Sequence, residues 1–536
     1  IQKAHGHSLS YEEKKEILKT QLFGIDIDRN ALQIAAFSLY LALLEDESPD
    51  FIRQKIEQEN PILPSLIGET LICGNTILED LFPGKAFDCI VSNPPWGSVP
   101  TYSEDSRTQK VYLQERKAIE NKEGNYPEYE FVADYERSQA FIARVAKWGN
   151  ESTVYVMVVK NSIFLNDKTL DFRRYVLNHY QIDTFYELSH YNEILFKKKV
   201  IGEVHGQKVE LGASEPCVVL IFKNKTDEGS KLYYISPKLT AFAKHFELIH
   251  YNSNDHFELP LSKFQEKDSL WKVLVNSDLE AYDLISNKLK NQSELEVEAR
   301  SGFQPKKEMK PLGEPIWRDL IVPSDFDQFV VKNKSVKKFN WNQELHRPRK
   351  DESIFIDKRI VIPVRPLKSD QFKFKGVLLD QDVVFKDDII SIRLKDEGEF
   401  IQNYLPYIGI INSNLLGFLF FQMSSQWGKG EGKREKIRNV DLERILPIRK
   451  IPSQSQLDRI TFLVNTIQGK KSESQDCQAE LDQLNEFVFD LYGLVDYEKE
   501  IIREFYDVRV NRAGKQESKV RPADIDIYFE AFKDAY

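Results

Sequence analysis

Cysteine is scarce in this sequence, and long apolar runs are missing from it. The 536 residues include four cysteines, which stand too far apart for a disulfide framework or a zinc cluster; they are Cys73, Cys89, Cys217 and Cys477. No apolar run reaches the roughly 18 residues that cross a bilayer, and no charged-then-apolar signal pattern opens the chain. We therefore expect a protein of the reducing cytoplasm, with no structural metal and no membrane contact.

An excess of positive charge is also missing. The chain has 74 Lys and Arg against 84 Asp and Glu, a formal net charge of -10. Phosphate binding relies on lysine and arginine, so this balance argues against a nucleic-acid partner unless the basic residues cluster. The chain also lacks an initiator methionine. It opens with Ile1, and we interpret it as a piece of a longer polypeptide.

The length predicts about three domains, at roughly 100 to 200 residues each. From about Thr20 to Lys225, short apolar runs alternate with amphipathic stretches, which is typical of an α/β fold with a mostly parallel sheet covered by helices. The runs lie at 21–27, 70–73, 87–92, 153–159, 184–188 and 217–222. Apolar residues between 30 and 45 recur at helical spacing, so this segment is predicted to be a crossover helix.

Beyond Lys225 this alternation fades into irregular polar sequence, with a helix predicted at 279–290. Strand-like runs at 359–364 and 389–394 follow, then a long apolar helix at 407–422 and further helices at 457–467 and 479–492. We therefore divide the chain into four parts. They are an α/β domain at 1–228, a connecting region at 229–300, a mixed α+β domain at 301–452 and a C-terminal helical segment at 453–536.

The most informative residues are Asn93-Pro94-Pro95-Trp96-Gly97, directly after the apolar run 87–92. Proline has no N–H and restricts the residue before it, so the chain must leave the sheet at this point. It leaves at the carboxyl end of a strand, where open α/β sheets place their active sites. The simpler alternative is a rigid turn, which Asn-Pro pairs often form.

This turn presents groups that activate an aromatic amine. An amine such as adenine N6 is a poor nucleophile, because its lone pair is delocalised into the ring. If the side-chain oxygen of Asn93 and the carbonyl oxygen of Pro94 each accept one N–H, the nitrogen becomes more tetrahedral and its lone pair points at an incoming methyl group. Trp96 offers a flat face for stacking a base extruded from the duplex.

Two more polar features stand at predicted strand ends. Asp26 and Asp28 follow the first run, where doubly wound folds place the carboxylate that holds a ribose diol. An aspartate here also serves as a helix N-cap; Asp28 fits the cap better, and Asp26 fits the ribose better. Asn75 follows the second run and is predicted to face a cofactor's adenine. Three such features in this order indicate a nucleoside cofactor.

Three motifs of this chain resemble the ordered motifs of the γ-class adenine-N6 DNA methyltransferases of bacteria and archaea. They are Gly24-Ile25-Asp26-Ile27-Asp28, Gly74-Asn75 and Asn93-Pro94-Pro95-Trp96. Such enzymes occur in type IIG restriction-modification systems and among phage-defence methylases, and the likeness continues through 139–141, 158–162 and 194–199. The resemblance implies a Rossmann-like class I methyltransferase sheet and S-adenosyl-L-methionine as the cofactor.

The resemblance also assigns roles to single residues. Asp26 would bind the ribose hydroxyls of S-adenosylmethionine, and Ile27 would pack on its adenine. Asn75 would contact the adenine edge, although family members more often carry Asp there, and Asn93 would lie against the cofactor as well as the target amine. Phe196 would sandwich the flipped base opposite Trp96, and its alternative is an ordinary core phenylalanine.

One family motif is missing from the chain. The glycine-rich loop that wraps the methionine end of the cofactor should precede Gly24 by about one helix, but residues 1–20 contain only Gly6. Either the loop lies upstream in the longer polypeptide, or the domain has lost cofactor binding. The start at Ile1 favours the first alternative. His5 and His7 stand nearby, and we expect exposed histidines there in preference to a metal site.

Residues 301–452 resemble the target-recognition domain that follows the catalytic domain in these enzymes, through the segments 410–416, 428–430 and 446–448. Such domains hold phosphates and read base edges, so they need basic loops. The candidate DNA-binding residues are Lys337, Lys338, Arg347, Arg349, Lys429, Lys433, Arg434 and Arg438. A charge run is often only a solvated face, but these basic clusters share one predicted domain of an acidic protein.

These features predict a site-specific DNA methyltransferase that transfers a methyl group from S-adenosylmethionine to N6 of a flipped-out adenine in duplex DNA, in a restriction-modification or phage-defence system. The expected partners are double-stranded DNA and an upstream nuclease or methyltransferase segment of the same polypeptide, or other defence-system subunits. The alternatives are a catalytically silent subunit that binds DNA or a partner, and a methyltransferase of RNA or protein amines.

Overall fold

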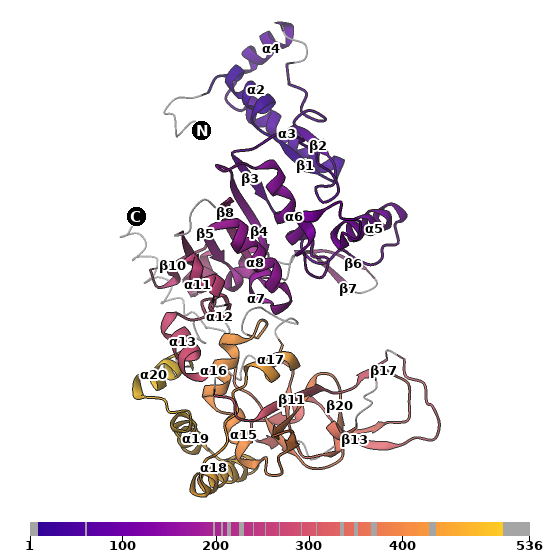
Figure 1. The fold of residues 1–536 in the computed structure, drawn as a ribbon. Helices are drawn as coiled ribbons and strands as arrows, with labels where there is room; N and C mark the ends of the chain where they lie inside the picture. Colours follow the sequence, from indigo (N-terminus) through magenta and orange to yellow (C-terminus); the bar gives the residue numbers. More distant parts are fainter. Residues whose placement is uncertain are drawn as a thin grey trace. The chain divides into compact units, whose positions relative to one another are not determined.

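The computed structural model describes residues 9–58, 62–196, 199–204, 207–211, 216–224, 230–239, 241–251, 253–266, 268–290, 292–306, 308–332, 337–347, 352–365, 372–427 and 436–506. The chain divides into two compact units (Figure 1). The first unit comprises residues 1–159, 168–182 and 220–228, and the second comprises 160–167, 183–219 and 229–536. The mixed α/β character that the sequence predicts is confirmed.

The first unit begins with two helices that flank a short strand. Its first elements are α2 (Tyr11–Thr20), β1 (Gly24–Asp26), α3 (Arg29–Leu44), α4 (Pro49–Gln58) and β2 (Leu71–Cys73). Ser10 and Glu13 form a capping box on α2, and Asp28 caps α3 by accepting the Asn30 N–H at 2.9 Å. The predicted crossover helix and the predicted cap at Asp28 are confirmed. β1 and β2 pair in parallel, and Gly24 stands opposite Leu71.

The remaining strands of the first unit lead to the Asn-Pro-Pro turn. The elements are β3 (Cys89–Ser92), α5 (Ser106–Glu120), η1 (Pro127–Tyr129), α6 (Arg137–Val145), η2 (Ala146–Trp148), β4 (Val154–Lys160), η3 (Asp167–Thr169) and α8 (Leu170–His179). β3 pairs in parallel with β4, with Cys89 opposite Val154. α6 is almost wholly buried, and Ala140 and Ile142 are fully enclosed. α6 is therefore a well-packed helix, whereas β3 itself is partly exposed.

The sequence predicts one sheet over residues 20–225, and among the described residues this prediction is wrong. β1 and β2 form a two-stranded sheet, and a separate sheet has the order β10-β9-β5-β8-β4-β3. Its further strands are β5 (Tyr180–Glu187), β8 (Cys217–Asn224), β9 (Lys231–Ile235) and β10 (His256–Pro260). β9 pairs in parallel with β5 and antiparallel with β10. The irregular region predicted beyond Lys225 is therefore also wrong, because tertiary pairing gives these short, half-polar strands their partners.

The second unit continues with short helices and one hairpin. Its elements up to residue 289 include α7 (Ser162–Leu165), η4 (Ser189–Tyr191), α9 (Asn192–Leu195), β6 (Lys199–Val204), β7 (Gln207–Leu211), α10 (Ala241–Phe246), η5 (Ser253–Asp255), α11 (Leu261–Glu266), α12 (Ser269–Val273), α13 (Leu279–Leu284) and η6 (Ile285–Leu289). The helix predicted at 279–290 is present, and its last part, η6, is a π-helix. β6 and β7 form the antiparallel hairpin.

Residues 296–400 form antiparallel and mixed sheets. One has the order β11-β21-β18-β19, with β22 on β21, and another has the order β16-β13-β20. The elements are β11 (Glu296–Ser301), β12 (Gln304–Pro305), β13 (Trp317–Ile321), η7 (Pro323–Asp325), β14 (Phe326–Asp327), β15 (Val330–Val331), β16 (Lys337–Asn340), β17 (Leu345–Arg347), α14 (Ser353–Ile356), β18 (Arg359–Pro363), β19 (Val377–Leu379), β20 (Val383–Phe385), β21 (Ile389–Asp396) and β22 (Glu399–Phe400). Phe303, Phe355 and Phe385 lie in their shared core. The strands predicted at 359–364 and 389–394 are confirmed.

The long apolar helix predicted at 407–422 is wrong, because the chain breaks it in two. α15 (Leu405–Ile411) and α16 (Asn414–Met423) meet at an angle of 52°. At the break, the side-chain oxygen of Asn412 accepts the Gly376 N–H at 2.6 Å, and its side-chain nitrogen donates to the Gly376 carbonyl at 2.9 Å. Ser413 then caps α16 by accepting the Leu416 N–H.

Within the described ranges, no single helix has the length and apolarity to cross a bilayer. The bent pair α15 and α16 passes that test of length and composition when its two members are taken together.

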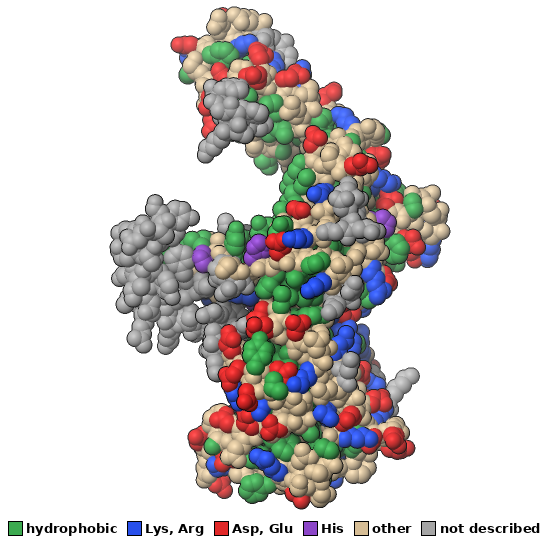
Figure 2. Space-filling view, turned by 60° about the vertical axis from the view of Figure 1, so that its left-hand side comes forward, with side chains coloured by type: hydrophobic (Ala, Val, Ile, Leu, Met, Phe, Trp, Pro, Cys, Tyr) green, Lys and Arg blue, Asp and Glu red, His purple; other side chains and the backbone are tan. Residues whose placement is uncertain are grey.

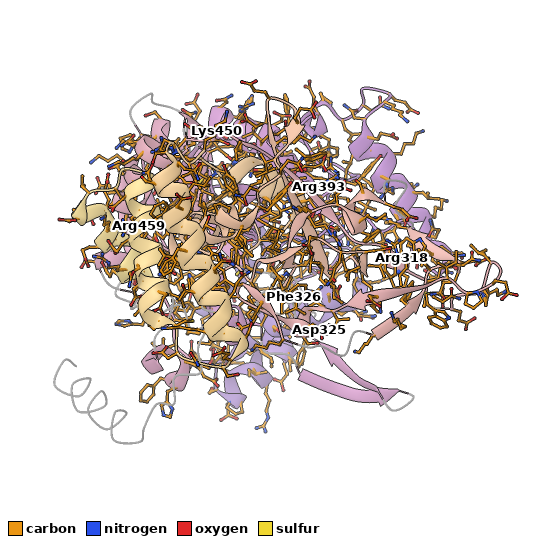
Figure 3. All side chains as sticks on the ribbon, turned by 90° about the horizontal axis from the view of Figure 1, so that it is seen from below. Arg318, Asp325, Phe326, Arg393, Lys450 and Arg459 are labelled. Carbon is orange, nitrogen blue, oxygen red and sulfur yellow. The ribbon has the colours of Figure 1, made fainter. Side chains whose placement is uncertain are left out.

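The chain then continues through helices to residue 504. They are α17 (Asn439–Ile445), α18 (Gln454–Ser472), α19 (Gln478–Leu491) and α20 (Asp496–Glu504). Figure 3 shows Arg459, from α18, on the helical side of this unit and Arg318, from β13, on its strand-rich side. The helices predicted at 457–467 and 479–492 are confirmed; α18 is longer than predicted at both ends, and α19 lies one residue earlier than predicted.

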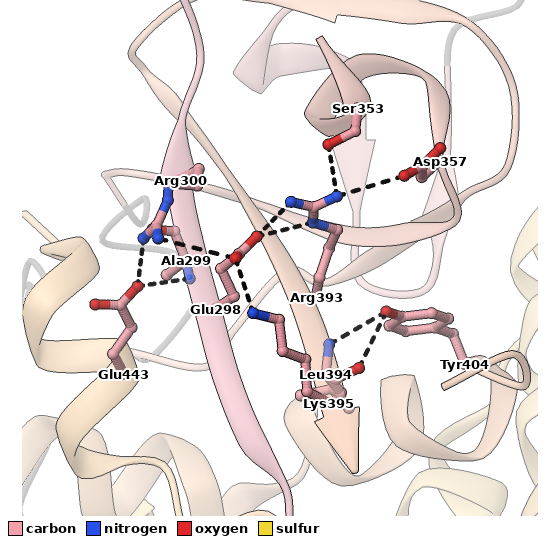
Figure 4. Close-up of polar contacts among 10 residues, drawn as sticks. All are labelled: Glu298, Ala299, Arg300, Ser353, Asp357, Arg393, Leu394, Lys395, Tyr404 and Glu443. Atoms are coloured by element: carbon pink, nitrogen blue, oxygen red, sulfur yellow. Dashed lines mark hydrogen bonds and ion pairs between the residues drawn. The ribbon is translucent and has the colours of Figure 1, made fainter. Parts of the chain in front are cut away.

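A buried network of charges joins the strands of this unit (Figure 4). Glu298 of β11 accepts two hydrogen bonds from the Arg393 guanidinium of β21, and the Lys395 ammonium lies 3.3 Å from the same carboxylate. Arg393 also donates to the Ser353 hydroxyl at 2.7 Å. Burial alone would raise the pKa of Glu298, but the hydrogen bond and charge of Arg393 outweigh it and lower that pKa. This carboxylate is therefore a structural anion.

Candidate active site

The Asn-Pro-Pro turn follows β3 in the first unit, as the sequence predicts. β3 ends at Ser92, and its neighbour Asn93 is exposed, whereas Pro94 is buried. The buried proline fixes the backbone beneath the turn, and the amide of Asn93 stands at the surface above it. An exposed amide held on a rigid base is available to a ligand. The catalytic roles of Asn93, Pro94 and Trp96 stay predictions.

Three hydrogen bonds hold the residues after the prolines. The Trp96 indole N–H donates to the carbonyl of Val158 in β4 at 3.0 Å, so the ring is anchored on the neighbouring strand. The Gly97 N–H donates to the Glu136 carboxylate at 2.7 Å, and the Gly97 carbonyl accepts the Arg137 N–H at 3.1 Å. Gly97 has a φ of 94°, which favours glycine at this position. The turn is therefore preorganised by β4 and by the start of α6.

Glu136 is the anchoring residue that the sequence analysis missed. Besides Gly97, its carboxylate accepts the Ser138 hydroxyl at 2.9 Å. It precedes α6, whose residues 139–141 carry part of the family resemblance. A carboxylate just ahead of that run was the available signal, but only the fold brings it to Gly97.

Asp26 and Ile27 stand at the carboxyl end of β1. Both are exposed, and Ile27 exposes 59% of its surface although it is apolar. One Asp26 carboxylate oxygen accepts the Asp28 N–H at 2.7 Å, and this contact orients the carboxylate. An exposed carboxylate beside an exposed aliphatic side chain suits the diol and the ring of a nucleoside. Their cofactor-binding roles stay predictions.

Asn75 lies one residue beyond β2, and it is buried. Its side-chain oxygen accepts the Ile77 N–H at 2.9 Å, and its side-chain nitrogen donates to Glu115 of α5 at 2.7 Å. These contacts fix the orientation of the amide. The predicted contact with a cofactor's adenine edge stays a prediction, and the bonds to Ile77 and Glu115 give Asn75 a structural role as well.

A cavity of about 360 Å³ lies between β1 and β3. Ile25, Thr76 and Ser92 line it, and each is an immediate neighbour of a candidate residue, Asp26, Asn75 or Asn93. Phe23, Phe82 and Phe87 close its other end with ring centroids 5.3 to 5.5 Å apart. One cavity of the first unit is therefore lined by a neighbour of each of the three candidate residues, and their convergence on a cofactor stays a prediction.

Phe196 lies in the second unit and follows α9, where its N–H donates to the Asn192 carbonyl at 2.9 Å. It is half-buried. Trp96 belongs to the first unit. The stacking of a base between these two rings stays a prediction.

A buried polar network stands at the strand ends of the second unit. Asn161 donates to the Ser189 hydroxyl at 2.6 Å, and that hydroxyl donates to the fully buried Glu187 carboxylate. Burial raises the pKa of Glu187, against the hydrogen bond from Ser189 and the charge of Lys238. The Leu188 N–H bonds the Cys217 carbonyl at 3.0 Å, so the network also joins the end of β5 to β8. The network therefore holds the end of β5 and the start of β8 together.

A second charged cluster surrounds Asp167 in the second unit. Lys272, only 2% exposed, donates to Asp167 at 2.8 Å, and Arg444 approaches it at 2.6 Å. Burial alone would raise the pKa of Asp167, but the hydrogen bond from Arg444 and the charge of Lys272 hold it at about 2. Arg438 points toward the same cluster, 3.6 Å from Asp167 and 2.6 Å from Asp441.

The candidate DNA-binding residues fall into three groups. Arg349, Lys429, Lys433 and Arg434 lie outside the described residues. Lys338 pairs with Asp319, and Arg438 pairs with Asp441 and Asp167. Lys337 and Arg347 are exposed, and within the described ranges no ion pair is assigned to them. Among the candidate residues, Lys337 and Arg347 are therefore exposed and have no ion pair assigned within the described ranges, and the DNA contacts stay predictions.

Comparison with known proteins finds a family model that matches the first part of the chain. Residues 20–194 match the family model described as Eco57I restriction-modification methylase. The type II restriction enzyme and methyltransferase RM.Eco57I of Escherichia coli is 36% identical over 107 residues. That alignment spans 17% of this chain and 10% of the relative, so it covers about a tenth of the relative's length.

Solved structures extend the likeness over more of the chain. The type IIL restriction-modification enzyme MmeI, in complex with DNA, matches with a TM-score of 0.52 and 12% identity, over 92% of this chain and 66% of that one. The type IIG restriction endonuclease BpuSI matches with a TM-score of 0.32 and 11% identity, over 90% of this chain and 65% of that one. The first likeness shows a shared fold, and the second is too low to add to it.

Proposed function

We propose that the chain is the methylating and DNA-reading part of an adenine-N6 DNA methyltransferase, a proposal supported by the match of residues 20–194 to the Eco57I restriction-modification methylase family model. The single observation that carries the proposal is the turn after β3. An exposed Asn93 stands on a buried Pro94, and the indole of Trp96 is fixed by its bond to Val158. The proposed substrate is duplex DNA with the target adenine turned out of the helix.

S-adenosylmethionine would supply the methyl group when bound, and the residues around the β1–β3 cavity fit such a nucleoside. Asp26 offers a carboxylate to the ribose hydroxyls, and Ile27 offers an apolar surface to the adenine. Both side chains are exposed at the end of β1, where open α/β sheets bind nucleotides. The glycine-rich loop that would hold the methionine end is absent from residues 1–20.

The proposed chemistry at the turn is a direct displacement. S-adenosylmethionine would supply the methyl group to the N6 lone pair when bound, and the surplus N6 proton would leave to solvent. The side-chain oxygen of Asn93 and the carbonyl of Pro94 accept the two N6 hydrogens, which frees the lone pair and stabilises the positive charge that develops on nitrogen. Trp96 stacks on the flipped base and holds it in line.

A test uses the intact polypeptide in which these residues occur. We expect tritium from methyl-labelled S-adenosylmethionine to enter duplex DNA, and nucleoside analysis to give N6-methyl-2′-deoxyadenosine as the product. Label in cytosine would contradict the adenine assignment. A protein that binds duplex DNA but neither binds S-adenosylmethionine nor transfers its methyl group would be the catalytically silent subunit instead. Transfer to RNA or protein but not to DNA would favour the other alternative.

A further inference from the structure

Glu136 stands at the start of α6, but its side chain does not cap that helix. It occupies the N-cap position, where Ser, Thr, Asp and Asn are favoured because their short side chains accept a helix N–H. Among the described residues, Glu136 makes no such capping bond to α6. Its carboxylate instead accepts the Gly97 N–H at 2.7 Å. This side chain therefore holds the turn after β3 in place of stabilising its own helix.

The backbone just after the turn is also paired with the backbone just before α6. The Gly97 carbonyl accepts the Arg137 N–H at 3.1 Å, and the Val99 N–H donates to the Tyr135 carbonyl at 2.9 Å. These two bonds flank an antiparallel bridge between the residues that stand in the middle of each segment. The chain therefore leaves the turn in a fixed direction.

Arg116 of α5 braces both members of this pairing. Its guanidinium lies over the Tyr135 ring, 3.9 Å from the ring centroid, and donates to the Val99 carbonyl at 2.9 Å. A guanidinium over an aromatic face attracts the ring electrostatically. One side chain thus holds the segment after the turn and the segment before α6 against each other.

The segment before α6 has an unusual backbone. Asp134 and Tyr135 have φ angles of 50° and 55°, in the left-handed region that favours glycine. The Ala133 N–H donates to the side chain of Gln139, which is only 1% exposed, at 2.8 Å. Strained backbone of this kind persists only where the surrounding structure holds it, and it is frequent at functional sites. Residues 133–136 therefore form a strap that α6 and Arg116 hold against the turn.

The strap acts at the point where the turn is least restricted. Trp96 is anchored by its bond to Val158, and Pro94 has a fixed φ. Gly97 is the most flexible residue of the turn, because glycine has no side chain to limit its backbone. The proposed chemistry needs the oxygens of Asn93 and Pro94 aimed at two hydrogens of one nitrogen. A misplacement of about 1 Å can lower a rate about a hundredfold.

We propose that Glu136 is a positioning residue for methyl transfer. By holding the Gly97 N–H, its carboxylate keeps the turn 93–97 in the orientation in which Asn93 and Pro94 accept the amine hydrogens. Glu136 acts through Gly97 and not on the substrate. The inference rests on the proposed function, but the contact between Glu136 and Gly97 has a consequence for backbone exchange that does not depend on it.

The main test compares Glu136→Ala with Glu136→Gln in the intact polypeptide. Glutamine keeps the oxygen that accepts the Gly97 N–H and the Ser138 hydroxyl, and it removes only the charge. We expect kcat to fall at least about tenfold in Glu136→Ala, while KM for duplex DNA stays within about twofold. Glu136→Gln should retain most of kcat. A normal kcat in Glu136→Ala, or an equal loss in both variants, overturns the proposal.

Amide hydrogen exchange at Gly97 reports on the contact itself. We expect this amide to exchange at least about tenfold faster in Glu136→Ala than in the unaltered protein, because its acceptor is removed. In Glu136→Gln the exchange should stay slow. The Tyr155 and Met157 amides of β4 serve as references for general loosening of the first unit. Unchanged exchange at Gly97 in Glu136→Ala overturns the proposal.

Glu136→Ser separates the turn from the helix cap. Serine can cap α6 by accepting a helix N–H, but its side chain is too short to replace the bond to Gly97. We therefore expect a thermal midpoint equal to or above that of Glu136→Ala, with kcat as low as in Glu136→Ala. A kcat restored by Glu136→Ser would show that the reaction needs the cap and not the contact with Gly97, and it would overturn the proposal.

Acidic side chains are common at the surface of the protein (Figure 2), so an exposed one supplies the matched control. Glu130→Ala makes the same chemical change at an exposed residue of the same unit and should leave kcat and the Gly97 amide unchanged. A loss in Glu130→Ala equal to that in Glu136→Ala overturns the proposal. An unaltered protein that transfers no methyl group contradicts the proposed function instead, and the exchange at Gly97 then decides whether Glu136 holds the turn.

Discussion

The β1–β3 region of the first unit exposes apolar side chains, whereas the β11–β21 sheet of the second unit buries even charged ones. Around β1 and β3, apolar side chains such as Ile27 and Val91 lie at the surface, and two strand edges lack partners among the described residues. In the β11–β21 sheet even charged groups are enclosed, as Arg393 and Arg359 are 4% and 0% exposed. The first region is open for ligands, and the second is closed.

This difference separates residues that act on ligands from residues that hold the fold. Asn93, Asp26 and Ile27 have surface to offer and few internal partners. The charged residues of the second unit, such as Glu298 and Asp167, form hydrogen bonds and ion pairs with other residues of the protein. Substitutions in the first region should therefore alter binding or transfer at nearly constant stability. Substitutions of the enclosed charges should alter stability and leave the activity per folded molecule unchanged.

The largest expected stability effect is at Asp167. Asp167→Asn leaves Lys272 buried without its counter-ion, and breaking a buried pair costs about 3 to 5 kcal/mol. Urea denaturation of the protein measures this loss as a lower free energy of unfolding of the second unit. The matched control is Asp171→Asn, whose pair with Arg174 is exposed and should change stability by less than about 1 kcal/mol. Equal small losses of stability in both variants would contradict a buried ion pair between Asp167 and Lys272.

Trp96 should show the opposite behaviour. Trp96→Ala removes the proposed stacking surface. This should raise the activation free energy of methyl transfer by about 1 to 3 kcal/mol and lower its rate roughly five- to 150-fold. The Val158 carbonyl loses one donor, which adds a small stability cost. Tyr102→Ala, at an aromatic residue 72% exposed nearby in sequence, is the control and should transfer normally. Kinetics under single-turnover conditions compare the two, and equal rates would remove Trp96 from the site.

Acid should weaken the closed region before it affects the open one. The pKa of Asp167 is lowered from 3.8 to about 2, so its contribution is fully present above about pH 4 and is lost as the pH falls toward 2. Its partial exposure limits the effect to less than about 2 kcal/mol. The difference in stability between the unaltered protein and Asp167→Asn should be smaller at pH 2 than at pH 5, because only the unaltered protein loses the Asp167 charge as the pH falls. A constant difference would contradict the assigned ion pairs.

The smallest effect is expected at Lys337 and Arg347, which are exposed. Replacing both with alanine should leave stability unchanged and weaken duplex binding. If each neutralises one phosphate, the slope of log K against log salt should fall by about 2. Lys19→Ala with Arg53→Ala removes the same charge from exposed positions of the first unit and should not change the slope. An unchanged slope in the first variant would remove these residues from the interface.

The sequence predicts the open region better than the closed one, and the reason is physical. Strand ends, the Asp28 cap and the turn at Pro94 are local features, written in a few adjacent residues. The cluster at Asp167 depends on Lys272 and Arg444, which are distant in the sequence. The break between α15 and α16 depends on the bond from Asn412 to Gly376. The strand β9 needs β5 beside it, so its own residues gave no clear pattern.

The same limit explains the split between β1 and β3. The motifs at Asp26, Asn75 and Asn93 predict neighbouring strand ends, and the cavity between β1 and β3 brings their neighbours together. Which sheet each strand joins depends on backbone pairing, and among the described residues β1 pairs with β2 and β3 pairs with β4. A reading of side-chain pattern alone does not reveal an unpaired backbone edge.

The most direct test of this account is the rate of methyl transfer to duplex DNA by Asn93→Ala in the intact polypeptide, relative to the unaltered protein. We expect a loss of at least about a thousandfold, because an oxygen that accepts the amine hydrogens in the transition state is removed. Thermal unfolding and DNA binding should stay within the range of the unaltered protein, since Asn93 is exposed. A variant that methylates adenine at the normal rate would contradict the role assigned to the turn after β3.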